Sequence, residues 1–379
     1  MPGEKSTYRV FVSAAEPSAD AHCAGLISAL SKKGYDMEFI GIGGPKMAHA
    51  GCELLESTAG KAAMIYNAFT QVAHFYKLIK RISRFLHDNN VDLVVVCDSP
   101  SFNFHVAKVA KKMGIKTLFY VAPQLWAWGG WRIRKLRQCC DKLCCLLPFE
   151  QDWFSSRGVE AVFVGNPLLD ELKIEAAHEA KYRDFRAENA KIAIMPGSRP
   201  AEIDSLWRPM QQIALRLKQK YPGATFVAVA VDAEREKALR AAQVPGFECR
   251  YVVDSVHKTA ATVDFSIVAS GSATLEVAAA GSPMVIMYQS NKVLWHLVGR
   301  WLVKTRYLSL VNILAGGELV PEFMPYFSSI EPIVASIEQL LKDNGKLAQV
   351  SKALTNLAQP LAAKNAREEV AKIAVEMLR

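Results

Sequence analysis

Short apolar, β-branched runs that alternate with helix-like stretches constrain the fold of this chain more than any other feature. The run Leu93–Cys97 is apolar at every position, as a strand is when both faces of its sheet are covered. Comparable runs are Arg9–Ala14, Glu38–Gly41, Thr117–Val121, Lys142–Leu146, Ala161–Val164, Ile192–Met195, Thr225–Val229, Cys249–Val253, Phe265–Ala269 and Met284–Tyr288. Strands that alternate with helices form parallel, doubly wound sheets, so the sequence predicts an α/β protein.

The strands are too many for one sheet of ordinary size, and the polar stretch Lys173–Lys191 has no strand signal. We therefore expect a Rossmann-like domain over 1–172, a second over 190–331, and a helical segment over 332–379. The two domains are expected to face each other across a cleft. Ligands of such sheets bind beyond the carboxyl ends of the strands. The helical segment packs either on the first domain or on a partner chain of a homodimer.

The charge balance indicates an anionic partner. Lys and Arg number 46 against 37 Asp and Glu, which gives a net charge of +9. Nucleic acid, acidic lipid and a phosphorylated substrate all fit this surplus. The amino-terminal residues carry no export signal, and no run reaches the roughly 18 uncharged apolar residues of a spanning helix. The sequence predicts a cytoplasmic protein that can lie on a membrane without crossing it.

Four cysteines, Cys139, Cys140, Cys144 and Cys145, are close together in the sequence. Their spacing differs from the paired C-x2-C of zinc sites, and no histidine is near. We interpret them as small buried residues of an apolar segment.

Candidate catalytic and binding residues follow the strands of the first half. Glu16, Ser18 and Asp20 follow the first strand, where the last two could also cap a helix. Asp98 follows Leu93–Cys97, where partial burial raises a carboxyl pKa towards the strength of a general base; a helix cap is the alternative.

Two further groups in the first half could contact sugars or lipids. Trp126 and Trp128 stand in a glycine-flanked loop, where they could stack on sugars or acyl chains or could plug the core. Apolar residues at helical spacing with interspersed bases predict an amphipathic helix that contacts either a membrane or the core: Ile65, Phe69, Val72, Tyr76, Lys77, Lys80, Arg81 and Arg84. Trp295, His296 and Trp301 could add a second membrane contact.

The second half repeats the pattern of strand, small-residue turn and helix. Pro196-Gly197-Ser198-Arg199 would present backbone N–H groups, a helix dipole and a guanidinium to a pyrophosphate. Ser272 and Glu276 follow a later strand, where the carboxylate could accept hydrogen bonds from a ribose or stabilise the first helical turn.

Taken in order, these segments resemble the lipid-A-disaccharide synthase family of inverting glycosyltransferases, which have the two-domain GT-B architecture. The segments that carry the resemblance are Glu16–Asp20, Gly41–Met47, Asp98–Asn103, Tyr120–Trp128, Leu147–Glu150, Gly165–Pro167, Met195–Glu202, Ala269–Glu276 and Leu302–Gly316. They extend over essentially the whole chain. Two departures, Ala19 and the turn Gly129-Gly130-Trp131, put the details of acceptor fit in question but not the reaction.

The resemblance implies that UDP-2,3-diacylglucosamine gives its sugar to 2,3-diacylglucosamine 1-phosphate at the inner face of the inner membrane, and that UDP leaves. It implies that Asp98 acts as the base, and that Arg199 with the Gly197 and Ser198 amides stabilises the charge on the diphosphate. Ser272, Glu276 and Asn312 would contact the nucleotide, and Glu16, Ser18, Asp20, Trp126 and Trp128 the acceptor side. No cofactor is expected, and no metal, because the chain has no Asp-x-Asp motif.

Other functions remain open at this point. A lipid or nucleotide-sugar carrier of the same fold would not need Asp98. A nucleotide-sugar epimerase would not need a basic amphipathic helix, and a muramyl-type transferase is a further GT-B alternative. A nicotinamide dehydrogenase fits poorly because the Gly41–Gly44 turn lacks G-x-G-x-x-G. Nucleic-acid binding would explain the charge but not the carboxylates after the strands, so no nucleic-acid partner is expected.

Overall fold

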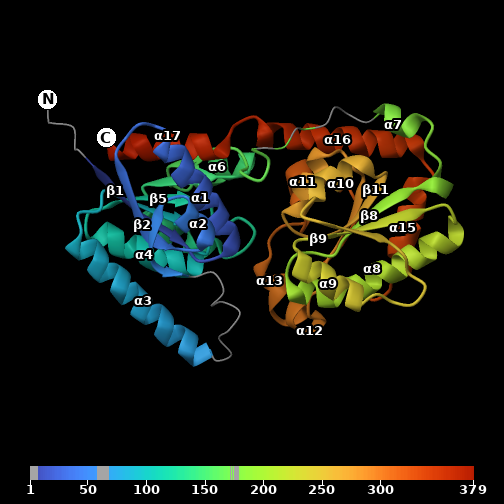
Figure 1. The fold of residues 1–379 in the computed structure, drawn as a ribbon, viewed down its shortest axis with the longest axis horizontal. Coiled ribbons are helices and arrows are strands. Elements are labelled where there is room, and N and C mark those ends of the chain that lie inside the picture. The colour runs from blue at the N-terminus through green and yellow to red at the C-terminus, as the bar shows by residue number, and fades with distance from the viewer. Residues whose placement is uncertain (1–6, 58–67, 171, 173, 175–178) are drawn as a thin grey trace. The chain divides into compact units, whose positions relative to one another are not determined.

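The computed structural model describes residues 7–57, 68–170, 172, 174 and 179–379, and the chain divides into two compact units. Unit 1 comprises Met1–Asp170 and Ala363–Arg379, and unit 2 comprises Glu171–Ala362. Each unit is a parallel α/β sheet with its own apolar core (Figure 1). The expected fold class, two α/β domains, is confirmed.

Unit 1 contains a seven-stranded sheet in the order β3-β2-β1-β4-β5-β6-β7. Its strands are β1 (Tyr8–Ala14), β2 (Met37–Gly43), β3 (Cys52–Ser57), β4 (Leu93–Cys97), β5 (Lys116–Tyr120), β6 (Lys142–Cys145) and β7 (Ala161–Phe163). Its helices are α1 (Pro17–Ser31), α2 (Pro45–His49), α3 (Ala68–Asp88), α4 (Pro100–Lys112), η1 (Gly130–Arg132), α5 (Ile133–Cys139), α6 (Pro148–Ser155) and α17 (Ala366–Leu378). Because β1 has β2 on one side and β4 on the other, the winding direction reverses between β1 and β4.

Unit 2 repeats this order with six strands, β10-β9-β8-β11-β12-β13. They are β8 (Lys191–Met195), β9 (Thr225–Ala230), β10 (Arg250–Val253), β11 (Phe265–Ala269), β12 (Met284–Met287) and β13 (Glu322–Phe323). The helices are α7 (Glu179–Arg183), η2 (Ala187–Asn189), α8 (Pro200–Lys220), α9 (Ala233–Ala241), α10 (Val256–Thr262), α11 (Ala273–Ala279), α12 (Lys292–Leu294), the π-helical turn η3 (Trp295–Gly299), α13 (Arg300–Leu302), α14 (Leu310–Ala315), α15 (Glu331–Leu341) and α16 (Asn344–Ala362). Here the winding reverses between β8 and β11.

Each predicted strand is found, and the sequence patterns missed β3 and β13. In β3 the carboxylates of Glu53 and Glu56 interrupt the apolar run, and only one neighbouring strand pairs with it. β13 has two residues, too few for any period to show.

The expected carboxyl-terminal segment is divided between the units. α15 and α16 belong to unit 2, whereas α17 returns to unit 1 and packs against α1 (Figure 1). Asp170 caps the returning helix, because its buried carboxylate accepts hydrogen bonds from the amides of Ala366 (2.7 Å) and Arg367 (3.2 Å). Gly165 is required nearby: its φ is 94°, and an added Cβ would lie 2.7 Å from the Lys364 carbonyl oxygen.

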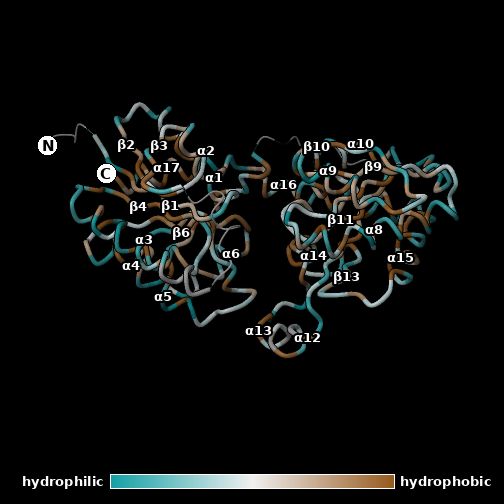
Figure 2. Tube along the Cα trace, turned by 60° about the horizontal axis from the view of Figure 1, so that its bottom comes forward, coloured by the Kyte–Doolittle hydropathy of each residue, from teal (hydrophilic) through white to brown (hydrophobic). Residues whose placement is uncertain are grey.

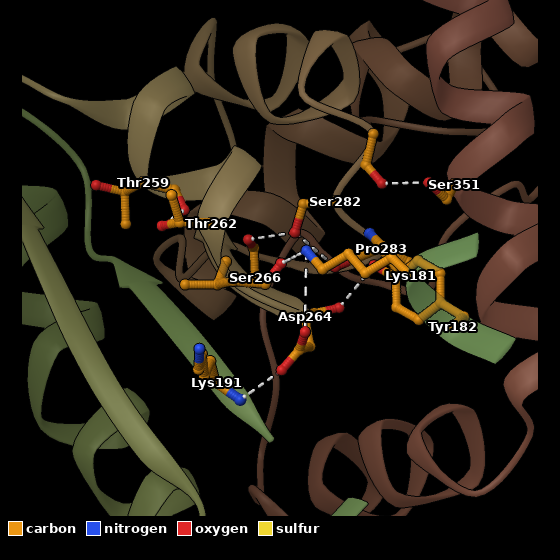
Figure 3. Close-up of polar contacts among 12 residues, drawn as sticks. Lys181, Tyr182, Lys191, Thr259, Thr262, Asp264, Ser266, Ser282, Pro283 and Ser351 are labelled. Atoms are coloured by element: carbon orange, nitrogen blue, oxygen red, sulfur yellow. Dashed lines mark hydrogen bonds and ion pairs between the residues drawn. The ribbon is translucent and has the colours of Figure 1, made fainter. Parts of the chain in front are cut away.

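Carboxylates that precede strands hold the sheets together. Asp92, Asp141 and Asp264 each stand one residue before a strand and accept a hydrogen bond of 2.8 Å from the amide of Arg9, Thr117 or Lys191 on the neighbouring strand. Figure 3 shows Asp264 in this position, with the Tyr182 hydroxyl donating to its carbonyl oxygen (3.0 Å). Acidic residues at the amino ends of the strands are therefore structural, and those at the carboxyl ends are the candidates for chemistry.

Candidate functional site

In unit 1 the candidate catalytic groups gather where the winding reverses. Glu16 follows β1 and Asp98 follows β4, and these two strands are neighbours. The Ser99 hydroxyl donates a 2.8 Å hydrogen bond to the Glu16 carboxylate and so connects the two strand ends. In doubly wound sheets the crevice at this position is the usual ligand site. Of the acceptor-side candidates, Glu16 and Ser18 are exposed here.

The turn that carries Asp98 is strained. Asp98 and Ser99 both have positive φ angles, 51° and 42°, which cost on the order of 1–3 kcal/mol each for residues other than glycine. Buried Asn103 holds the turn: its amide donates to the carbonyl oxygens of Cys97 (2.9 Å) and Asp98 (2.7 Å), and it accepts from the Ser13 hydroxyl (2.7 Å). The surrounding structure therefore imposes a sharp turn that leaves Asp98 partly exposed at the end of a buried strand.

Asp20 lies behind this edge and has a structural task. Its buried carboxylate accepts hydrogen bonds from the amides of Gly44 (2.8 Å), Lys46 (3.1 Å) and Met47 (3.0 Å), which open α2. This explains why a carboxylate and the Gly41–Met47 turn occur together. With three donors already bound, Asp20 shapes the site and has little capacity left for an acceptor.

The tryptophan loop has one fixed side chain and one exposed side chain. Trp126 is buried and donates from Nε1 to the carboxylate of buried Glu150 at 2.9 Å. The other oxygen of Glu150 accepts from the amides of Leu146 (3.1 Å) and Leu147 (3.0 Å). Trp128 is exposed, with the Arg132 guanidinium 4.2 Å from its ring centre. Trp126 is thus part of the core, as one of the two interpretations of the sequence had it, and Trp128 is accessible to a ligand.

Two titratable groups of unit 1 were not predicted from the sequence. Burial raises the pKa of Glu150 to about 7, although its three hydrogen bonds oppose the shift. Burial, with Arg367 and Lys46 nearby, lowers the pKa of His22 to about 4, so this imidazole is neutral at pH 7. Glu150 is the last residue of the Leu147–Glu150 segment that carries the resemblance, and this position was its only signal in the sequence.

In unit 2 the turn predicted to bind an anion, Pro196–Arg199, is hydrogen-bonded to a residue of the helix that follows it, α8. Gly197 has φ 103°, and the amides of Ser198 (3.1 Å) and Arg199 (3.2 Å) donate to the Glu202 carboxylate. The Arg199 guanidinium pairs with the same carboxylate at 3.1 Å and remains 76% exposed. In this structure the Glu202 carboxylate therefore binds the same amides and guanidinium that were expected to bind a diphosphate.

Ser272 and Glu276 lie on the neighbouring strand end, after β11. Ser272 is exposed at the start of α11. Burial and the nearby Asp254 raise the pKa of Glu276 to about 7, while a hydrogen bond from the His257 amide opposes the shift. β8 and β11 are neighbours at the reversal of unit 2, so the turns at 197–199 and 270–272 lie at the position that corresponds to the Glu16–Asp98 edge of unit 1.

Asn312 is buried and fully hydrogen-bonded inside the protein. Its amide nitrogen donates to the Val320 carbonyl oxygen (2.8 Å) and the Glu322 carboxylate (2.9 Å), and its oxygen accepts from the Leu319 (2.9 Å) and Val320 (3.1 Å) amides. Glu322 also accepts from the Ser309 hydroxyl at 2.6 Å. The Ser309–Gly316 pattern of the sequence therefore secures a loop against β13, which sequence reasoning had not anticipated.

The predicted amphipathic helix is α3, whose side chains the structure describes from His74 onward. Ile65 lies outside the described residues, as do the side chains of Phe69 and Val72. Tyr76 is 67% exposed, and the basic side chains Lys77, Lys80, Arg81 and Arg84 are exposed as well. Leu78, Ile82 and Leu86 are buried, so the face of the helix that carries them packs on unit 1, while the bases lie on the exposed face. In the part of the chain that the structure describes, no helix is long and apolar enough to cross a membrane.

The remaining features near these sites are structural. Cys139, Cys144 and Cys145 are buried, as predicted, and Cys140 is half-buried. Among the described residues, no group of three or more His, Cys, Asp or Glu side chains could hold a metal ion. A groove of about 460 Å³ in unit 2 is lined by residues that include Thr225 and Arg250. These residues begin β9 and β10, so the groove lies at the edge of the sheet opposite to the candidate site.

Comparison with known proteins gives concordant results for sequence and fold. The family model described as lipid-A-disaccharide synthetase matches residues 10–377. A lipid-A-disaccharide synthase of Trichlorobacter lovleyi is 32% identical over 98% of this chain and 97% of its own length. That of Anaeromyxobacter dehalogenans is 32% identical over 96% of this chain and 97% of its own length.

Solved structures with little sequence identity share the fold. A UDP-GlcNAc 2-epimerase of Neisseria meningitidis bound to UDP-GlcNAc has a TM-score of 0.60 at 14% identity and covers 98% of this chain and 99% of its own. The MurG structure of Acinetobacter baumannii has a TM-score of 0.59 at 14% identity with the same coverage. The calicheamicin glycosyltransferase has a TM-score of 0.62 at 13% identity and covers 99% of both chains.

Proposed function

The chain belongs to the lipid-A-disaccharide synthase family, and we propose that the strand-end turns at its two winding reversals carry out the family's glycosyl transfer. The protein is a glycosyltransferase of GT-B fold. It transfers 2,3-diacylglucosamine from UDP-2,3-diacylglucosamine to 2,3-diacylglucosamine 1-phosphate, and UDP leaves. A UDP-sugar and a lipid acceptor are thus its substrates.

Asp98 is proposed as the general base. The acceptor's 6-hydroxyl must lose a proton as its oxygen attacks the anomeric carbon, and a single inverting attack needs one base. The observation that carries this proposal is the Asp98–Ser99 turn: two residues at positive φ, fixed by Asn103 and joined to Glu16 through Ser99. Strain of this kind concentrates at functional sites, where the surrounding structure maintains it.

The donor's nucleotide is proposed to bind at the turns after β8 and β11. As the glycosidic bond breaks, negative charge develops on the departing diphosphate, and Arg199 with the Gly197 and Ser198 amides would stabilise it. Glu202 must then release these groups. Its ion pair with the exposed Arg199 is worth about 0–1 kcal/mol, so a diphosphate can replace it. Ser272 and Glu276 complete this side with a hydroxyl and a carboxylate for the ribose.

The acceptor side is proposed to divide into contact residues and supporting residues. Glu16, Ser18 and Trp128 are exposed and could contact the acceptor. Asp20 and Trp126 are committed to internal hydrogen bonds and fix the α2 turn and the tryptophan loop behind them. Asn312 likewise acts on the nucleotide side by holding its loop.

The lipid substrates require contact with a membrane surface, and we assign this contact to α3. Its exposed bases Lys77, Lys80, Arg81 and Arg84 suit the acidic lipids of an inner leaflet, and exposed Tyr76 can insert at the headgroups. Figure 1 shows the amino-terminal end of α3 extending beyond the rest of unit 1. We place the protein at the inner face of the inner membrane on this basis.

The test is UDP release from donor and acceptor in detergent micelles, with EDTA present. We expect turnover in the wild type and a fall of about 100-fold or more in Asp98→Asn, the usual effect of removing a general base. Asp152→Asn, which changes an exposed carboxylate of α6, is the matched control. Equal turnover in wild type and Asp98→Asn would remove Asp98 from its role and leave the reaction intact. Detergent-independent turnover of UDP-GlcNAc without an acceptor would favour an epimerase.

A further inference from the structure

An exposed apolar ridge stands on unit 2, outside the candidate site. It consists of Val293, Leu297 and Trp301, which recur every four residues along α12, η3 and α13 and are 67%, 70% and 70% exposed. Residues four apart lie on one side of a helix, so the three side chains form a single stripe. Figure 2 shows α12 and α13 projecting from the sheet of unit 2. Large apolar side chains gathered in this way mark an interaction surface.

Side-chain contacts with Tyr326 connect the segment that carries the ridge to the rest of unit 2. His296 hydrogen-bonds through Nε2 to the Tyr326 hydroxyl at 2.8 Å, and Lys292 lies 5.4 Å from the centre of the same ring. Gly299 makes room for half-buried Trp295: an added Cβ would lie 2.4 Å from the indole. Trp295 therefore packs on Gly299 within the same segment, whereas the three ridge residues are exposed.

The charge around the ridge identifies its partner. Between Glu276 and Glu318 the chain contains no Asp or Glu, whereas it contains Lys292, Arg300, Lys304 and Arg306. Lys304 and Arg306 are exposed beyond the end of α13. Apolar side chains on a helix surface, in a stretch of chain that has bases and no acids, are typical of helices that lie in a membrane interface.

We propose that this ridge binds the surface of an anionic lipid bilayer and gives unit 2 a membrane contact of its own, separate from α3 of unit 1. The inference rests on the proposed function, because substrates that carry acyl chains reside in a membrane. Val293, Leu297 and Trp301 enter the headgroup region, and the bases pair with lipid phosphates. A second attachment would keep the donor-binding unit at the surface that supplies its substrate.

The test is co-sedimentation of the full chain with vesicles of phosphatidylcholine, with and without phosphatidylglycerol. The variant Val293→Ser/Leu297→Ser/Trp301→Ser should bind the anionic vesicles at least about tenfold more weakly. Lys304→Gln/Arg306→Gln should lose about fivefold for each charge, and its residual binding should depend less on salt. Val231→Ser/Val253→Ser, which changes exposed apolar residues elsewhere in unit 2, is the matched control and should bind as the wild type does.

Turnover in detergent micelles separates this inference from the proposed function. The ridge variant should keep wild-type turnover there, which also shows that it folds. Wild-type vesicle binding by the ridge variant, with turnover intact, would overturn the inference and leave the proposed function standing. Equal binding of the wild type to neutral and anionic vesicles would overturn it as well. So would a dimeric wild type together with a monomeric ridge variant of unchanged vesicle binding, because the ridge would then contact a second copy.

Discussion

Replacement of Glu150 by glutamine should change the way stability depends on pH. The carboxyl is buried and its pKa is raised from 4.5 to about 7. Between these two values the unfolded chain has released the proton and the folded chain still holds it, so the free energy of unfolding falls as pH rises. The interval is about 2.5 pH units at about 1.4 kcal/mol each, or about 3.5 kcal/mol for the full titration, of which about 3 kcal/mol lies above pH 4.5.

Glutamine does not titrate, so Glu150→Gln loses this contribution. The difference in unfolding free energy, wild type minus variant, should fall by about 3 kcal/mol between pH 4.5 and pH 8. Taking the difference removes the contributions of every other titrating group. Urea unfolding measures it, and pulsed hydrogen exchange of β6 peptides assigns the transition to unit 1.

Glu53→Gln is the control, because it changes an exposed carboxylate of β3 in the same unit. Its difference from the wild type should stay within about 0.5 kcal/mol across the pH range. A pH-independent difference for Glu150→Gln would refute the reasoning, since Glu150 would then be ionised in the folded state over the whole interval. A difference that rises with pH would show that the three donors, rather than burial, dominate its titration.

Three further predictions test individual contacts. Asp20→Ala leaves three amides of the α2 turn without their acceptor, so the free energy of unfolding measured in urea should fall by about 2–4 kcal/mol. A fall of less than about 1 kcal/mol would mean that water replaces the carboxylate. The difference in unfolding free energy, wild type minus His22→Gln, should fall by up to about 3 kcal/mol as pH drops from 6.5 to 4, because the unfolded chain protonates His22 and the folded chain does not; a difference that does not change with pH would contradict this. Glu202→Ala frees the Ser198 and Arg199 amides and should tighten UDP binding by about threefold to fivefold in calorimetry; weaker binding would show that Glu202 orders the turn for the nucleotide.

The sequence was most informative where a pattern repeats. Buried strands such as Leu93–Cys97 show as unbroken apolar runs, and the parallel, doubly wound fold follows from their alternation with helices. Strand ends were located for the same reason, so Asp98 and Glu16 could each be placed at the end of a strand in advance, whereas the pairing of these two strands came from the structure. β3 and β13 lacked such a pattern because one is an interrupted edge strand and the other has two residues.

Partners distant in sequence could not be predicted. Asp20 meets Gly44 and Trp126 meets Glu150 across 24 residues each, and nothing local to either residue indicates the other. The sequence identified polar residues at strand ends but not whether a ligand or the chain itself would satisfy them. The same difficulty applies to α3, where one apolar stripe contains the core residues Ile82 and Leu86 and the exposed Tyr76.

The cost of releasing each predicted ligand group from its internal partners separates those that can bind substrate from those that shape the site. Asn312 would give up buried hydrogen bonds, at about 1–3 kcal/mol for each group left unsatisfied, and Asp20 would release three amides at a similar cost. Arg199 would give up a solvent-exposed pair worth about 0–1 kcal/mol, which a diphosphate more than replaces by charge-assisted hydrogen bonds. We therefore propose that the exposed groups at the two winding reversals bind the substrates, and that the buried groups of the same motifs hold the turns in the conformation that presents them.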